Sequence, residues 1–269
     1  MSRLASTFAE FKKTGHKALI PFITAGDPNP DFTVPMLHAM VEAGADIIEL
    51  GIPFSDPMAD GPVIQHASER ALKHDMSLRR TLEMVTEFRQ TNQTTPIILM
   101  GYANPVEAMG YTAFADAASK AGVDGVLTVD LPPEEAQECA DLLNAHAIDQ
   151  IFLLAPNSSV ERIKKMDKIG SGFLYYVAVK GVTGAGHLDT ADVQRKLVDI
   201  RANTNLPIGI GFGIKEASTA AEISTLGDAV VVGSALISKI AANLDAPETA
   251  KNEIVKLLTS MRHAMDQQV

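Results

Sequence analysis

The sequence predicts a single-domain (β/α)8 barrel over residues 1–269, with an extra N-terminal helix. Three observations lead to this fold class. Short apolar runs recur eight times, helical patterns separate them, and the chain of 269 residues has the length of such a barrel. Most of the runs are continuously apolar, which is typical of parallel strands buried on both faces. An open doubly wound sheet is the main alternative, but no GxGxxG motif follows the first run.

The elements follow one another without a linker or a break in composition. A helix over about residues 2–14 puts Leu4, Phe8 and Phe11 on one face, which is expected to close the bottom of the barrel. The expected strands are residues 19–24, 46–50, 96–102, 125–130, 150–155, 173–179, 207–211 and 229–233. Between and after them, helices are expected over residues 35–43, 112–121, 133–145 and 235–240, near Lys215, and along the apolar stripe of Ile254, Leu257, Leu258, Met261 and Met265.

Composition limits the class of protein. The chain is 46% hydrophobic and 21% charged, which is ordinary for a soluble globular protein. Its net charge of −10 disfavours a nucleic-acid or anionic-membrane surface. The lone cysteine, Cys139, rules out an internal disulfide framework and fits a reducing compartment. No apolar stretch reaches the roughly 18 residues of a membrane-spanning helix, and the N-terminus lacks the core of a signal peptide. We therefore expect a cytoplasmic protein.

The first candidate site residue is an acid inside an apolar run. Glu49 lies at the end of the second expected strand, and barrel active sites lie at the carboxyl ends of the strands. A buried carboxyl is costly unless it is paired, protonated or used in chemistry. Pointing into the barrel, Glu49 would have a raised pKa suited to acid/base catalysis; pointing outward, it would meet an equally apolar helix layer. The structural alternative is a buried glutamate satisfied by a neighbouring donor.

A second acid follows in the next loop. Asp60 comes eleven residues after Glu49, within an Asp-Gly-Pro sequence that is typical of a turn. If Asp60 is only a turn residue, its side chain bonds its own backbone and has no role in chemistry. The loop over residues 52–61 also contains two prolines and two aspartates, which favours a shaped functional loop.

Glycine turns near the end of the chain predict a phosphate site. Gly213 follows the seventh expected strand, and Gly233 and Ser234 follow the eighth. Their amides can bind phosphate at helix N-termini, in the loops where barrels commonly do so, although either turn could be purely structural. Residues 179–189, with three glycines, resemble either a lid or an ordinary long loop. The seven histidines show no metal-ligand spacing, so no metal site is expected.

Several segments together resemble the tryptophan synthase α subunit family. The similarity is carried by residues 19–28 (LIPFITAGDP), 49–62 (ELGIPFSDPMADGP), 100–105 (MGYANP), 130–132 (DLP), 181–184 (GVTG), 211–213 (GFG) and 233–234 (GS). It extends over essentially the whole chain in order. The resemblance implies a (β/α)8 barrel that cleaves indole-3-glycerol phosphate into indole and glyceraldehyde 3-phosphate by a retro-aldol reaction.

The resemblance also assigns roles to residues. Glu49 would shuttle protons, Asp60 would stay ionised and accept the indole N–H, and Tyr175 would lie near Glu49. The residues implied to wall the indole are Phe22, Ile64, Met100, Val129, Leu153 and Phe212. Those implied to hold phosphate or form the lid are Thr183, Gly184, Gly213, Gly233 and Ser234.

By the same resemblance the chain has a protein partner. A pyridoxal-phosphate-dependent β subunit would receive indole through a tunnel, in an α2β2 assembly, while this chain carries no cofactor. The residues implied to face the partner are Pro53, Asp56, Pro57, Asn104, Leu131 and Pro132.

Two other functions remain open at the level of sequence. A Schiff-base aldolase would use Lys180, just past the sixth expected strand, and would be trapped on its substrate by borohydride. A non-catalytic, phosphate-binding regulatory subunit would release no indole at any concentration.

Overall fold

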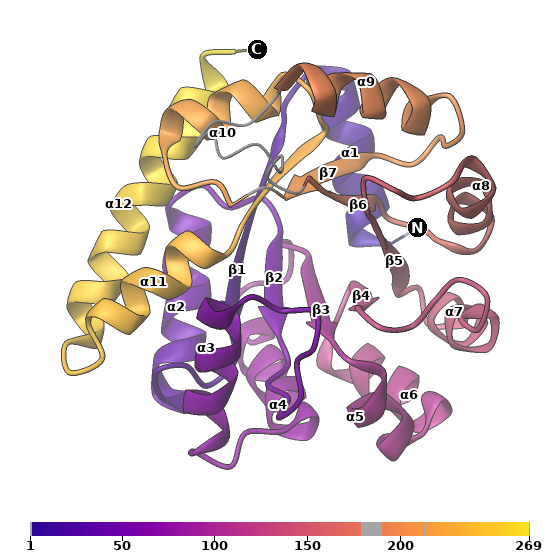
Figure 1. The fold of residues 1–269 in the computed structure, drawn as a ribbon. Coiled ribbons are helices and arrows are strands. Elements are labelled where there is room, and N and C mark those ends of the chain that lie inside the picture. Colours follow the sequence, from indigo (N-terminus) through magenta and orange to yellow (C-terminus); the bar gives the residue numbers. More distant parts are fainter. Residues whose placement is uncertain (1, 179–189, 212, 269) are drawn as a thin grey trace.

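The predicted barrel is confirmed. The computed structural model describes residues 2–178, 190–211 and 213–268, and in these ranges eight parallel strands close in the order β1-β2-β3-β4-β5-β6-β7-β8. Figure 1 shows the strands surrounded by helices. The strands are β1 (Ala18–Thr24), β2 (Ile48–Gly51), β3 (Ile97–Gly101), β4 (Gly125–Thr128), β5 (Asp149–Leu154), β6 (Leu174–Val177), β7 (Ile208–Gly211) and β8 (Ala229–Val232).

The extra N-terminal helix is also present. The helices are α1 (Arg3–Thr14), α2 (Pro30–Glu42), α3 (Pro62–Leu72), α4 (Leu78–Arg89), α5 (Ala103–Met109), α6 (Tyr111–Ala121), α7 (Gln137–Ala145), α8 (Val160–Ile169), α9 (Thr190–Arg201), α10 (Ala217–Ser224), α11 (Ser234–Ala242) and α12 (Pro247–Asp266). In the part of the chain that is described, none of them combines the length and the apolar character needed to cross a membrane.

Two helices, α2 and α7, begin away from their expected starts, and in both cases the expected start was a proline. Helix α2 begins at Pro30, because Asn29 caps it by accepting the amide N–H of Phe32 at 3.1 Å. The sequence prediction had taken Pro35 as the start, but Pro35 lies inside the helix. Helix α7 begins at Gln137 instead of residue 133. Residues 133–135 before it form a turn, in which the amide N–H of Glu135 donates to the carbonyl of Pro132 at 3.0 Å.

Alternation along the strands separates two apolar clusters. The interior cluster, which fills the barrel, consists of Leu4, Phe8, Ala18, Ile20, Ile47, Ile98, Leu127, Ile151, Phe173, Ala229 and Val231. The outer cluster lies between strands and helices and includes Ile48 and Leu50. Because successive side chains of a strand point to opposite faces, residue 49 belongs to the interior face together with Ile47.

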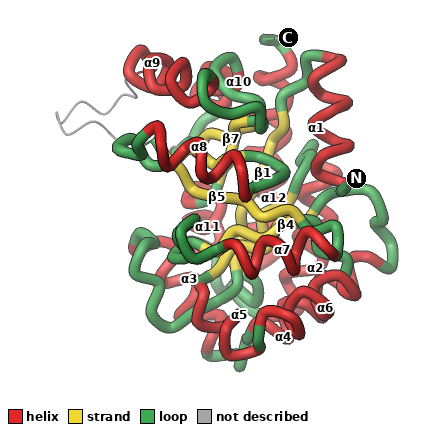
Figure 2. The backbone as a smooth tube through the Cα atoms, turned by 90° about the vertical axis from the view of Figure 1, so that its right-hand side faces the viewer, coloured by secondary structure: helices red, strands yellow, loops and turns green. Residues whose placement is uncertain are grey.

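Helix α1 closes one end of the barrel, as expected. Leu4 and Phe8 belong to the interior cluster, and the Phe8 ring lies 5.7 Å from the ring of Phe173 at the start of β6. Figure 2 shows α1 and the N-terminus along one edge of the molecule, beside the strands. The end of the barrel opposite the strands' carboxyl ends is therefore plugged by side chains.

Aspartates at the starts of strands tie neighbouring strands together at this closed end. Each lies just before a strand, and its carboxylate accepts the backbone N–H of a residue at the start of the preceding strand. The bonds run from Leu19 to Asp46 at 2.8 Å, from Ile97 to Asp124 at 2.8 Å and from Ile208 to Asp228 at 2.9 Å.

Asp124 is the most deeply buried of the three. Besides the Ile97 amide, it pairs with the Arg89 guanidinium of α4 at 2.6 Å and with the Arg3 guanidinium of α1 at 2.7 Å. Its side chain is 3% exposed and that of Arg89 is 7% exposed. Removal of either partner would leave a buried charge without compensation, which costs far more than the loss of an exposed pair. Asp124 therefore joins two strands and two helices.

We expect Asp124→Ala to lower the free energy of unfolding by about 3 kcal/mol or more, because the Arg89 charge stays buried without its partner. Urea denaturation followed by circular dichroism measures the change. The control is Asp116→Ala, which removes a half-exposed aspartate paired with His146 at 2.8 Å. Its effect should stay within about 0.5 kcal/mol. Equal effects of the two variants would contradict the role given to Asp124.

Candidate active site

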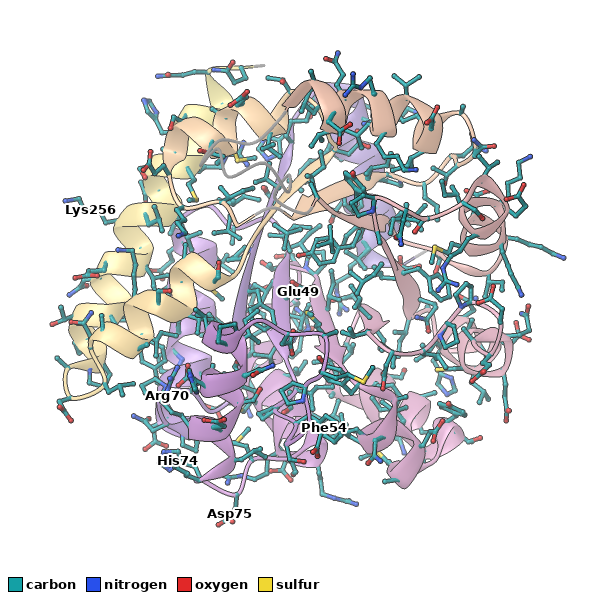
Figure 3. All side chains as sticks on the ribbon, in the orientation of Figure 1. Glu49, Phe54, Arg70, His74, Asp75 and Lys256 are labelled. Atoms are coloured by element: carbon teal, nitrogen blue, oxygen red, sulfur yellow. The ribbon has the colours of Figure 1, made fainter. Side chains whose placement is uncertain are left out.

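Glu49 points into the barrel. It lies on β2 opposite Phe22 of β1 and Ile98 of β3, and only 1% of it is exposed. Figure 3 shows it near the centre of the ring of strands. Burial, and secondarily the charge of Asp60, raise the pKa of Glu49 from 4.5 to about 8. No donor among the described residues bonds the carboxyl, which disfavours the purely structural reading.

Asp60 lies in the loop between β2 and α3 and is held by a tyrosine. The Tyr102 hydroxyl donates to Asp60 Oδ2 at 3.1 Å and accepts the N–H of Ala59 at 3.1 Å. The Tyr102 ring stacks on Phe54 with their centroids 5.3 Å apart. Burial raises the pKa of Asp60, and the hydrogen bond from Tyr102 opposes that rise. Asp60 is thus more than a turn residue bonded to its own backbone.

Tyr175 enters the same space from β6. It lies opposite Leu153 of β5 and Gly209 of β7. Burial, then the charges of Glu49 and Asp60, raise the pKa of Tyr175 well above its ordinary value, so the phenol stays neutral. Glycine is required at Gly211, because a methyl group there would collide with the phenol of Tyr175.

A pocket at this end of the barrel combines apolar walls with a carboxylate. It is lined by Phe22, Thr24, Gly51, Ile52, Asp60, Ile64, Ser68, Met100, Gly101, Tyr102 and Val129. Four of the six residues expected to wall the indole are among them. Leu153 packs on the interior cluster together with Tyr175. Phe212 lies outside the described residues. Apolar walls with a few placed polar groups are typical of sites for small aromatic molecules.

Three polar residues of this pocket were not assigned a role from the sequence. Tyr102 is the last residue of the third expected strand, and no local pattern indicates its contact with Asp60. Thr24 and Ser68 also line the pocket, and the Thr24 hydroxyl is buried with no hydrogen-bond partner among the described residues. No local pattern marks Thr24 or Ser68; only the convergence of β1 and α3 brings them together.

The expected phosphate residues lie at the ends of β7 and β8. Gly233 is the residue before α11, whose first residue is Ser234, so their amides belong to a helix N-terminus. Gly213 is exposed, has a φ of +34°, and nothing lies within 4 Å of where a Cβ would be. Helix α10 begins only at Ala217, four residues later. The lid segment 179–189, with Thr183, Gly184 and Lys180, lies outside the described residues.

The expected partner residues come from the loops after β2 and β4 and from the start of α5. Asp56 and Asn104 are exposed, whereas Pro53 and Leu131 are buried in the isolated chain. Pro57 and Pro132 are intermediate. Met58, in the loop after β2, is not among the residues expected from the sequence. Its side chain is 83% exposed, the highest fraction among the exposed large apolar residues of the described chain.

No metal site is apparent in the part of the chain that the structure describes. Residues 2–178, 190–211 and 213–268 contain no group of three or more His, Cys, Asp or Glu side chains that could hold an ion. The buried Cys139 packs in the outer cluster beside α7 residues, and burial raises the pKa of its thiol to about 11.

Comparison with known proteins gives one consistent result. The family model of the tryptophan synthase alpha chain matches residues 8–266. The tryptophan synthase alpha chain of Methylococcus capsulatus is 64% identical over 99% of this chain and 100% of its own length. That of Thioalkalivibrio sulfidiphilus is 59% identical over the same shares. The crystal structure of tryptophan synthase subunit alpha from Legionella pneumophila superposes with a TM-score of 0.93 at 43% identity, covering 99% of each chain.

The raised pKa of Glu49 predicts a pH-dependent gain in stability for Glu49→Gln. In the unfolded chain the carboxyl ionises near 4.5, whereas in the folded chain it ionises near 8. Its contribution to stability is therefore complete below about pH 4.5 and is lost as pH rises through about 8. At about pH 9 the variant should be more stable than the parent by about 2 kcal/mol or more, with a smaller difference at about pH 5.

Urea denaturation at several pH values measures this difference. The control is Glu83→Gln, which changes an exposed glutamate of α4 in the same chemical way. A stability difference between Glu49→Gln and the parent that does not grow with pH would contradict the raised pKa of the buried Glu49 carboxyl.

Proposed function

The chain belongs to the tryptophan synthase alpha chain family, and we propose how the residues at the open end of its barrel perform that family's reaction. It cleaves indole-3-glycerol phosphate to indole and glyceraldehyde 3-phosphate, as a carbon–carbon lyase of tryptophan biosynthesis. Family membership therefore decides against the non-catalytic regulatory subunit. The assignment of individual residues is our proposal.

Glu49 is the proton shuttle. The bond that breaks joins indole C3 to the glycerol carbon that bears a hydroxyl group. The protonated Glu49 carboxyl gives its proton to C3, and the carboxylate then takes the proton of that hydroxyl. The hydroxyl becomes the aldehyde, and the electrons of the broken bond restore the aromatic indole. The proton count balances, and Glu49 ends protonated as it began.

A pKa near 8 suits this duty. At neutral pH the Glu49 carboxyl is mostly protonated, so it can act first as an acid. Its conjugate base is then strong enough to accept the hydroxyl proton. This buried carboxyl at the carboxyl end of β2, which no donor among the described residues bonds, is the single observation that carries the proposal.

Asp60 stabilises the charge that forms on the ring. Protonation at C3 leaves the indole nitrogen cationic, and an ionised Asp60 that accepts its N–H would stabilise this species. Burial raises the pKa of both acids, but Asp60 accepts a hydrogen bond from Tyr102 that opposes the rise. These different environments support a protonated Glu49 that acts as the acid and an ionised Asp60, because a two-acid site needs pKa values that lie apart.

The rest of the substrate is held around these acids. Phe22, Ile64, Met100 and Val129 line the pocket beside Asp60, and Leu153 lies next to Tyr175, which supports their role as walls for the indole ring together with Phe212. The amides of Gly233 and Ser234 at the start of α11 would bind the phosphate, with Gly213, Thr183 and Gly184 completing the site.

We further propose a partner and a location. The exposed Asp56 and Met58 of the loop after β2, and Asn104 at the start of α5, lie at the open end of the barrel, where a pyridoxal-phosphate-dependent β subunit would dock and receive indole. The complex would be an α2β2 assembly in the cytoplasm, and this chain, as one domain over residues 1–269, would carry no cofactor of its own.

Glu49→Gln is expected to lower the rate of indole release by about 10²- to 10⁴-fold, because glutamine can neither give nor take the proton. Indole release from indole-3-glycerol phosphate is followed with and without a β subunit. Glu83→Gln is the control and should keep the parent rate. Near-normal release by Glu49→Gln would refute the shuttle. Borohydride trapping of substrate on Lys180 would instead favour an imine mechanism.

Met58→Ser tests the docking surface. An apolar side chain this exposed contributes nothing to the isolated fold, but its burial in an interface stabilises the complex. We expect the Kd for the β subunit to rise about tenfold, while indole release by the isolated chain stays unchanged. Titration calorimetry measures the Kd. Leu244→Ser, at an exposed apolar position between α11 and α12, is the control and should bind normally. An unchanged Kd for Met58→Ser would show that Met58 is not part of the interface with the β subunit.

A further inference from the structure

We propose that Tyr102 is a positioning residue for Asp60, keeping that carboxylate ionised and turning one of its oxygens towards the indole N–H. The proposal rests on the role given above to Asp60. It adds a residue that directly follows β3 to a pair of acids that both come from β2 and the loop after it.

The hydrogen bonds of Tyr102 have a fixed direction. A backbone amide can only donate, so the Tyr102 oxygen accepts the N–H of Ala59 at 3.1 Å. The single phenolic proton is then available for Asp60 Oδ2, also at 3.1 Å. A donor aimed at a carboxylate favours its ionised form. The other carboxylate oxygen has no bond to a described residue, which leaves it available to substrate.

The ring of Tyr102 is itself held in place. It is 3% exposed and stacks on Phe54, with an angle of 28° between the rings. The next residue, Ala103, donates its amide to Asp130 at 2.7 Å, which fixes the backbone beyond β3. The loop that contains Asp60 is therefore attached to β3 at two points, the Phe54 ring and the Ala59 amide. Figure 3 shows Phe54 beside the barrel, away from Glu49.

The charged and titratable groups around Asp60 make this donor important. Glu49 of β2 and Tyr175 of β6 interact with its charge, and Asp130 after β4 acts on Tyr102. Glu49 and Asp130 add negative charge, and none of these groups is a cation. In the described part of the chain no cation pairs with Asp60, so the phenolic proton is what opposes the effect of burial on its pKa. Burial and the charge of Asp60 raise the pKa of Tyr102 itself, which keeps that proton in place.

Tyr102→Phe removes the donor and keeps the ring and its stack on Phe54. Hydrogen bonds to charged groups are the stronger ones, so we expect kcat for indole release to fall about 10- to 100-fold, with a much smaller change in KM. The acidic limb of the kcat–pH profile should move to higher pH. Carbon NMR of the labelled Asp60 carboxyl, recorded without substrate, should show that the pKa of Asp60 also moves upward.

The matched control is Tyr111→Phe, which also removes a bond from a tyrosine hydroxyl to a carboxylate, that of Glu107 at 3.0 Å, away from the site. Its kcat and pH profile should match the parent. An unmoved Asp60 titration in Tyr102→Phe, or a loss that appears in KM alone, would overturn the inference. The variant Asp60→Asn separates the two proposals. Near-normal indole release by Asp60→Asn would refute the role of Asp60. A large loss of indole release in Asp60→Asn, together with a parent-like rate in Tyr102→Phe, would refute only the role of Tyr102.

Discussion

The free-energy cost of keeping the Glu49 carboxyl inside an apolar barrel is the constraint on which the site depends. The surrounding strands exclude water from it, which raises its pKa to about 8 and leaves it protonated near neutral pH. The same dry environment would also neutralise a second acid close by. Burial raises the pKa of Asp60 as well, but the Tyr102 phenol, which fastens the Asp60 loop to the end of β3, donates to this carboxyl and opposes the rise. The proposed chemistry needs both environments at once: Glu49 with no donor among the described residues, and Asp60 with a donor.

That arrangement requires a rigid support, which the closed end supplies. Asp124 joins β3 and β4 to α1 and α4 through buried ion pairs, and Leu4 and Phe8 fill the barrel floor. The contacts of Asp46, Asp124 and Asp228 thus lie at one end of the strands, and the two acids of the site lie at the other. A barrel keeps stability and chemistry apart in this way, so the loops of the active end can vary without loss of the core.

The sequence predicted the barrel well, because eight continuous apolar runs admit few other folds. It also marked both acids, but it could not decide which way Glu49 points. Both faces of β2 are apolar, and only ring closure distinguishes them. The Asp60–Tyr102 bond joins residues 42 positions apart in different loops, so no local pattern contains it. The start of α7 was wrong because two prolines and two glutamates suit a first helical turn and a plain turn equally well.

The inner face of β7 carries only glycine, at Gly209 and Gly211, and the aromatic side chains of β6 occupy the space this leaves. A side chain at Gly211 has room only when Tyr175 is made smaller, because the two would otherwise overlap. Changes at these positions are therefore not independent in their effects. Over evolutionary time they are constrained to change as a pair, so an ancestor with a larger residue on β7 would have carried a smaller one on β6.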